Sequence, residues 1–403
     1  MPFILVTVLL DVVAIGLMIP VLPHLVGSFT SSPSEQAFWY GAVSFSFGIA
    51  NFFGAPVLGA LSDRFGRRPV LLLGFSGLAL SFFVTALATA LWMLIVVRLI
   101  SGVMQSNAAV ANAYVADITP PEDRARRFGL LGAAFGVGFI LGPVMGGLLG
   151  SINLQLPFFV AGVLALVNWL YGYFVLPESL PAEHRQPFAW RRANPVAALR
   201  GLTQLEGVTP LVAVVALSGL AQFVVHASWV LYGTFKFGWG PLQNGWSLCA
   251  VGVASAIVQG GLLKHLLRRF SAERLVAMGL VSSTLALLCW GLATEGWMMY
   301  AVIGLNLLGF AVTSAVQSMI SAAADARSQG RTMGSVASLN SLMAVIAPVI
   351  AALLLGLGSH QSKGSWLVGL PFYFGAALQL ASAVIAVRHF RRSAARVHAA
   401  AAA

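Results

Sequence analysis

Long apolar segments dominate the sequence, and each is about as long as the hydrocarbon core of a bilayer is thick. A transmembrane helix needs about 20 consecutive apolar residues. Twelve segments of about that length follow one another, at 3–23, 37–60, 69–88, 92–117, 127–150, 154–176, 209–233, 240–263, 275–294, 297–320, 332–357 and 366–388. They are apolar on every side, whereas the strands of a membrane barrel alternate with period two. The pattern therefore predicts an all-α polytopic membrane protein with twelve transmembrane helices.

The longest polar stretch, residues 177–208, divides the chain into two halves of six predicted helices. The halves resemble each other weakly, because GALSDRFGRR at 59–68 has a counterpart in GLLKHLLRRF at 261–270. Repeated halves are typical of secondary transporters whose site lies between them. We therefore predict two pseudo-symmetric six-helix bundles, at 1–176 and 209–403, joined by a cytoplasmic linker at 177–208.

The few charged residues are distributed unevenly. Only 9% of the residues are charged and 59% are hydrophobic, which excludes an ordinary soluble protein. Most Lys and Arg residues fall in loops on one side of the predicted spans, and by the positive-inside rule that side is the cytoplasm. We therefore expect both termini in the cytoplasm and a multi-pass location in a bacterial-type inner membrane. The net charge of +11 then indicates topology and affinity for anionic lipids, and not a nucleic-acid partner.

The sequence contains no motif for enzymatic chemistry. It has no phosphate-binding Walker loop, no His/Cys/Glu cluster with metal-ligand spacing, and no nucleophile elbow or paired carboxylates. The two cysteines, Cys249 and Cys289, lie inside apolar segments and imply no disulfide framework. We therefore expect a protein that is not an enzyme and uses neither a cofactor nor a metal.

A charged turn, GALSDRFGRRP at residues 59–69, joins the second and third predicted spans. Gly59 would allow close helix approach, and Asp63 would pair with neighbouring arginines. The stretch matches the GxLxDRxGRR signature loop, and the chain therefore resembles the major facilitator superfamily. The resemblance implies that Asp63, Arg64 and Arg67 take part in conformational gating.

Two other stretches resemble particular branches of that superfamily. The fifth span has the glycine and proline pattern of antiporter-type members, carried by Gly129, Gly138, Gly142, Pro143, Gly146 and Gly147. Glycines at helical spacing permit close helix packing, and Pro143 would add a kink, so we expect gating at Gly142 and Pro143. The first span, LLDVVAIGLMIPVLP at 9–23, resembles that of tetracycline-efflux drug–proton antiporters.

The sequence also departs from the tetracycline exporters. These exporters carry carboxylates in their third and ninth helices, where this chain has Ser81 and Ser283. A glutamine typical of their second helix is replaced by Asn51. These differences argue against tetracycline with its bound divalent metal as the substrate.

Asp11 and Arg98 are ionisable residues deep inside predicted spans. A charge at this depth costs roughly 2.5–3.5 kcal/mol on insertion scales. Asp11 would either carry protons or be a paired structural group, and we favour the proton carrier. Arg98 would either pair with Asp11 or nearby backbone carbonyls and thereby couple proton binding to conformation, or clamp the first and fourth spans together.

Asp117 ends the fourth span beside the predicted cytoplasm. The family resemblance suggests that it pairs with Arg67 or Arg64 and closes a charge network with Asp63 that holds the outward-open state. The alternative is a solvated surface carboxylate.

Polar residues inside the spans are candidates for a substrate cavity. Gln222, His226 and Trp229 share one helix face by their spacing and would form an aromatic wall with polar points. His226 would contact substrate, or it would be a packing residue. Four other candidates lie in apolar spans: Asn51, Gln105, Asn306 and Gln317.

Together these observations predict a monomeric, proton-coupled secondary transporter that works by alternating access. It would export a hydrophobic or amphipathic small molecule, as in drug efflux and antibiotic resistance, with the proton gradient as energy source and the bilayer as surroundings. The alternative is an uptake facilitator or proton symporter for a specific small metabolite, possibly an anion. A receptor or scaffold on the same fold would show no substrate flux.

Overall fold

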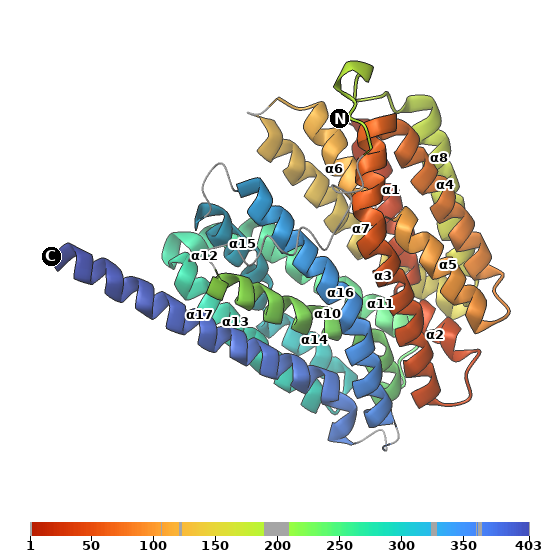
Figure 1. The fold of residues 1–403 in the computed structure, drawn as a ribbon. Helices are drawn as coiled ribbons and strands as arrows, with labels where there is room; N and C mark the ends of the chain where they lie inside the picture. The colour runs from red at the N-terminus through yellow and green to blue at the C-terminus, as the bar shows by residue number, and fades with distance from the viewer. Residues whose placement is uncertain are drawn as a thin grey trace. The chain divides into compact units, whose positions relative to one another are not determined.

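A computed structural model describes residues 2–105, 107–120, 123–188, 209–323, 329–359, 361 and 365–402. These residues form helices joined by short loops and contain no strand (Figure 1). The helices of the first half are α1 (Pro2–Met18), α2 (Leu22–Gly27), α3 (Pro33–Phe65), α4 (Arg67–Ala86), α5 (Leu91–Met104), α6 (Asn107–Asp117), α7 (Arg124–Ile152), α8 (Leu156–Val175) and the short η2 (Ala182–His184). Those that follow are α10 (Thr209–Phe237), α11 (Pro241–Ile257), η4 (Val258–Leu262), α12 (Leu263–Arg269), α13 (Ala272–Leu292), α14 (Gly296–Leu305), η5 (Gly309–Ala311), α15 (Val312–Ala323), α16 (Gln329–Ser359), η6 (Trp366–Gly369) and α17 (Leu370–Ala402).

The predicted count of membrane helices is confirmed. Within the described residues, eleven helices are long and apolar enough to cross a bilayer, and a bent pair makes a twelfth. That pair, Gly296–Leu305 and Gly309–Ile320, bends by 58°. The bend begins at Asn306, whose side chain is buried and accepts a hydrogen bond from the Ser282 hydroxyl at 3.2 Å.

The chain forms two compact units, and their boundaries differ from the predicted division in one segment. The first unit contains Met1–Pro195 and Gly238–Gly252, and the second contains Val196–Phe237 and Val253–Ala403. The first part of α11 therefore packs with the first unit. Small residues explain this, because a Cβ added at Gly147 would lie 2.7 Å from the Pro241 carbonyl oxygen. Of the predicted linker, residues 189–208 lie outside the described part of the chain.

Helix α1 lies against α7 and α8 in the first unit. At its contact with α7 the two backbones meet, since a Cβ added at Gly16 would lie 2.8 Å from the Gly142 Cα atom. The glycine pattern of the fifth span thus serves close packing, as small residues do between membrane helices. Helix α7 runs through Pro143 as one continuous helix.

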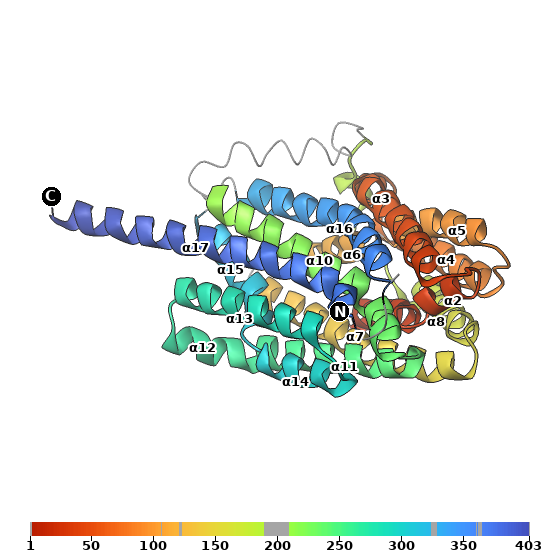
Figure 2. The same cartoon turned by 90° about the horizontal axis from the view of Figure 1, so that it is seen from below.

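In the second unit, α10 packs against both α16 and α17, and α13 packs against α17 (Figure 2). The core between these helices includes an aromatic cluster of Trp229, Trp290 and Phe372. These bulky rings pack between α10, α13 and α17 and bury the face of α10 that carries Trp229.

Candidate functional site

An ion-pair network lies where α3 ends and α4 begins. The guanidinium of Arg67 donates from Nη1 to Asp63 Oδ1 at 2.5 Å and from Nε to Asp117 Oδ2 at 3.0 Å. The predicted pairing of Asp63, Arg67 and Asp117 is therefore present. Arg64 is not part of these pairs and instead lies over the Phe65 ring, 5.0 Å from its centroid.

The turn between the two helices depends on Gly66. Its φ of +102° lies in the region that disfavours residues with a side chain. The interpretation of Gly59 was wrong, because a Cβ added there would meet no described residue within 4 Å and no close helix contact requires a glycine at this position. The close approach occurs at Gly66, where an added Cβ would collide with the Glu178 carboxylate.

Glu178 was missed in the sequence, although it holds this turn. Its Oε1 accepts from the backbone N–H of Arg67 at 2.8 Å, and its Oε2 accepts from that of Arg68 at 3.3 Å. These N–H groups begin α4, and a carboxylate there satisfies unpaired donors and the positive end of the helix dipole. An acidic residue directly after the sixth span was visible, but nothing in one sequence pairs it with a turn more than a hundred residues away.

The residues around Glu178 form hydrogen bonds with the same helix ends as the ion-pair network. We call residues 177–186 the strap. The Ser179 hydroxyl donates to Asp117 Oδ2 at 3.2 Å, and the Gln186 N–H donates to the Asp63 carbonyl at 3.0 Å. The Tyr114 hydroxyl donates to the Pro177 carbonyl at 3.0 Å. The strap therefore joins the ends of α3, α4 and α6.

Removing the Glu178 carboxylate should weaken this end of the unit. Glu178→Ala leaves the first N–H groups of α4 without their acceptor and should lower the free energy of unfolding by about 1 kcal/mol, as loss of a helix cap does. Thermal unfolding of the purified protein in detergent measures this. Glu183→Ala, an exposed carboxylate in the same strap, is the matched control, and equal loss in both variants would contradict the capping role.

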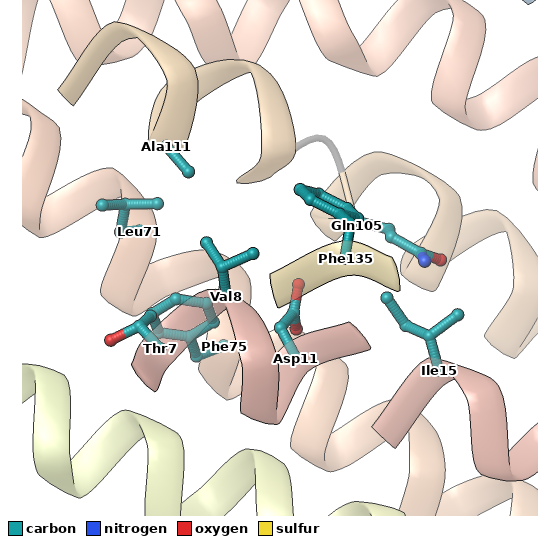
Figure 3. A pocket seen from close by; sticks show the side chains of 9 residues that line it. All are labelled: Thr7, Val8, Asp11, Ile15, Leu71, Phe75, Gln105, Ala111 and Phe135. Atoms are coloured by element: carbon teal, nitrogen blue, oxygen red, sulfur yellow. The ribbon is translucent and has the colours of Figure 1, made fainter. Parts of the chain in front are cut away.

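Asp11 lies in a cavity inside the first unit. The cavity has a volume of about 70 Å³, enough for several water molecules. Its lining comes from α1, α4, α6 and α7 and from the end of α5: Thr7, Val8, Asp11, Ile15, Leu71, Phe75, Gln105, Ala111 and Phe135. Figure 3 shows the carboxylate of Asp11 pointing into the space that these mostly apolar side chains line.

The Asp11 carboxylate makes no hydrogen bond or ion pair with any described residue. The predicted pairing with Arg98 is wrong. Arg98 is 6% exposed, its Nη2 contacts the sulfur of Met18, and it lies 5.9 Å from the centroid of the Phe47 ring. Met18 is seven residues beyond Asp11, about 10 Å along the helix. Arg98 therefore contacts α1 and α3 from α5, as in the structural alternative.

Two polar residues predicted for the cavity in the first unit have different surroundings. Gln105 lines the Asp11 cavity. Asn51 instead donates from Nδ2 to the Gly102 carbonyl at 3.1 Å and joins α3 to α5.

The candidates in the second unit do not form one wall. Gln222 and His226 are exposed on α10. Trp229 is 3% exposed, with its ring 5.2 Å from that of Trp290. The prediction that Trp229 shares an open face with them is therefore corrected, because the aromatic cluster covers α10 at that level. Asn306 is buried at the bend beside α14, which is a correction to its predicted position in a cavity, and Gln317 is partly exposed on α15.

Comparisons with known proteins agree with this geometry. Residues 4–348 match the family model of the Major Facilitator Superfamily. The tetracycline resistance protein of class C from Escherichia coli is 39% identical over 91% of this chain and 92% of its own length. The class B protein from Escherichia coli is 32% identical over 92% of each chain.

Solved structures share the fold. The nucleoside transporter NupG has a TM-score of 0.77 at 14% identity and covers 96% of this chain and 98% of its own. The human organic anion transporter MFSD10 has a TM-score of 0.71 at 24% identity, with coverage of 96% and 98%. The chain is a multi-pass membrane transporter that belongs to the Major Facilitator Superfamily, in the branch that contains the tetracycline resistance proteins.

Proposed function

We propose that this protein is a proton-coupled antiporter that exports a hydrophobic or amphipathic small molecule by alternating access. The observation that carries the proposal is Asp11, a carboxylate without a described partner in a cavity inside a membrane-spanning bundle. The tetracycline resistance proteins among its relatives support export and do not favour the alternative of metabolite uptake.

The chemistry of Asp11 suits a proton carrier. An ionised carboxylate inside the membrane is costly, and binding a proton removes that cost. A carboxylate held by an arginine would stay ionised, but no described arginine pairs with Asp11. Exchange of its proton with water from one side and then the other would link proton entry to the conformational cycle.

The remaining parts of the proposal concern the surroundings of the protein. We infer a monomer in a bacterial-type inner membrane, with both termini in the cytoplasm. The one-sided distribution of basic residues supports this topology. The proton gradient supplies the energy, with no cofactor and no nucleic-acid partner.

Transport into proteoliposomes under an imposed pH gradient tests the proposal. An antiporter should accumulate a lipophilic dye such as Hoechst 33342 in vesicles with an acidic interior, and a protonophore should abolish this accumulation. Tetracycline with and without Mg²⁺ serves as a second probe. Accumulation only in vesicles with an alkaline interior would identify proton symport instead and contradict the proposal.

A further inference from the structure

Asn168 is a buried amide in α8 that is bonded to the helix carrying Asp11. It is 0% exposed, and its Nδ2 donates to the Thr7 carbonyl oxygen at 2.9 Å. This bond joins residues 161 positions apart and crosses from α8 to α1. Asn168 itself does not line the Asp11 cavity.

The acceptor of this bond belongs to the same helical turn as Asp11. In an α-helix the carbonyl of residue i accepts from the N–H of residue i+4, so the Thr7 carbonyl is the helical partner of the Asp11 N–H. Asn168 places a second donor on that oxygen. Thr7 also lines the cavity. The amide therefore holds the turn that carries the carboxylate and part of the cavity wall.

Helix α8 also supports a second wall of the cavity. A Cβ added at Gly172, one turn after Asn168, would lie 3.8 Å from the ring of Phe75. Phe75 belongs to α4 and lines the cavity. Helix α8 thus packs against both α1 and α4. Asn168 donates the hydrogen bond from α8 to α1, the helix that carries Asp11.

Packing alone does not account for an asparagine here. The Oδ1 atom of Asn168 is buried and has no hydrogen-bond partner among the described residues. A leucine, whose side chain branches in the same way, would leave no unsatisfied acceptor at this site. The unsatisfied acceptor calls for an explanation. The hydrogen bond that the Nδ2 atom donates to Thr7 provides one.

We propose that Asn168 is a positioning residue for proton exchange, which fixes the orientation of Asp11 in its cavity through the Thr7 carbonyl. This inference rests on the proposed role of Asp11 as proton carrier. Loss of the amide removes the hydrogen bond between this turn and α8, and displacement of a reacting group by about 1 Å is enough to cost a large part of a rate.

The test compares two transport modes of Asn168→Leu in proteoliposomes. Proton-driven accumulation of Hoechst 33342 requires Asp11 to bind and release a proton, whereas counterflow of the dye at equal pH requires only the substrate-loaded protein to change conformation. We expect proton-driven transport to fall about tenfold, with counterflow within about twofold of the wild type. A merely structural role would lower both modes in proportion and would overturn the proposal.

A second variant keeps the test informative if the leucine variant does not fold. Asn168→Asp has nearly the same volume and donates a hydrogen bond only while it is protonated. Its ratio of proton-driven transport to counterflow should therefore fall as the pH rises, more steeply than in the wild type. An unchanged pH profile would contradict the proposal.

The control removes another buried side-chain amide that bonds to a different helix. Gln379 is 3% exposed in the second unit, and its Oε1 accepts from the Ser218 hydroxyl at 3.0 Å. Gln379→Leu should leave the ratio of the two modes unchanged. Asp11→Asn separates the two hypotheses: if it retains proton-driven transport, the proposed function fails. If it loses that transport while Asn168→Leu keeps the wild-type ratio, only the positioning role fails.

Discussion

Proton-driven transport should be lost when Asp11 is replaced by Asn, while the folded protein and its substrate exchange remain. The amide has nearly the same shape as the carboxylate but cannot take up and release a proton at physiological pH. Because no described residue pairs with Asp11, its removal breaks no ion pair. We expect the initial rate under a pH gradient to fall by at least about 100-fold, the scale of losing an essential proton-transfer group.

Fluorescence of a pH dye trapped in proteoliposomes measures this loss directly, because substrate added outside should no longer release protons from the lumen. Dye counterflow at equal pH should stay close to that of the wild type. Glu273→Gln, an exposed carboxylate in the first turn of α13, provides the control for removal of a negative charge. Wild-type proton release by Asp11→Asn would refute the assignment of Asp11.

Substitution of Gly142 by Val should destabilise the first unit. A Cβ at this position would lie 2.6 Å from the Gly16 Cα atom and 3.0 Å from the Val13 carbonyl oxygen. Both obstacles are backbone atoms of α1, so no side-chain rotation relieves the clash. Overpacking typically costs about 1–3 kcal/mol, and we expect the upper end of that range or more here.

Thermal unfolding of the purified protein measures the effect, followed by the reaction of the partly buried Cys249 of the first unit with a thiol-reactive dye after the exposed Cys289 has been replaced by Ser. Gly136→Val in the same helix is the matched control, because open space surrounds Gly136 within the described residues. The prediction fails if the two variants unfold at the same temperature. Since α1 also carries Asp11, partly folded Gly142→Val protein should show impaired proton coupling as well.

The twelve spans were predictable because length and hydropathy alone decide whether a segment crosses a bilayer. The network of Asp63, Arg67 and Asp117 was predictable because the signature loop carries two of its members and the family resemblance suggested the third. The spans required no knowledge of which helices are neighbours in space.

The positions of Arg98 and Trp229 depend on which helices are neighbours in space. Arg98 lies seven residues into α5 and Asp11 twelve residues before Pro23, so the two differ in depth and their pairing was a poor expectation. Spacing places Trp229 on the face of Gln222, but the rings packed against α10 decide its burial.

Glu178 and Asn168 could not have been predicted for a related reason. Each is a single polar residue with no repeating pattern, and its partner is more than a hundred positions away. Only the packing of the helices brings each pair together.

The strap limits where a tag or protease site can be inserted into this transporter and where its chain can be divided. Topology alone would place an acceptable insertion point anywhere after Val175, where α8 ends. The hydrogen bonds made by residues 177–186 mean that an affinity tag or protease site in this stretch would pull apart the ends of three helices. When the two halves are expressed as separate chains, these ten residues should therefore stay attached to the first half.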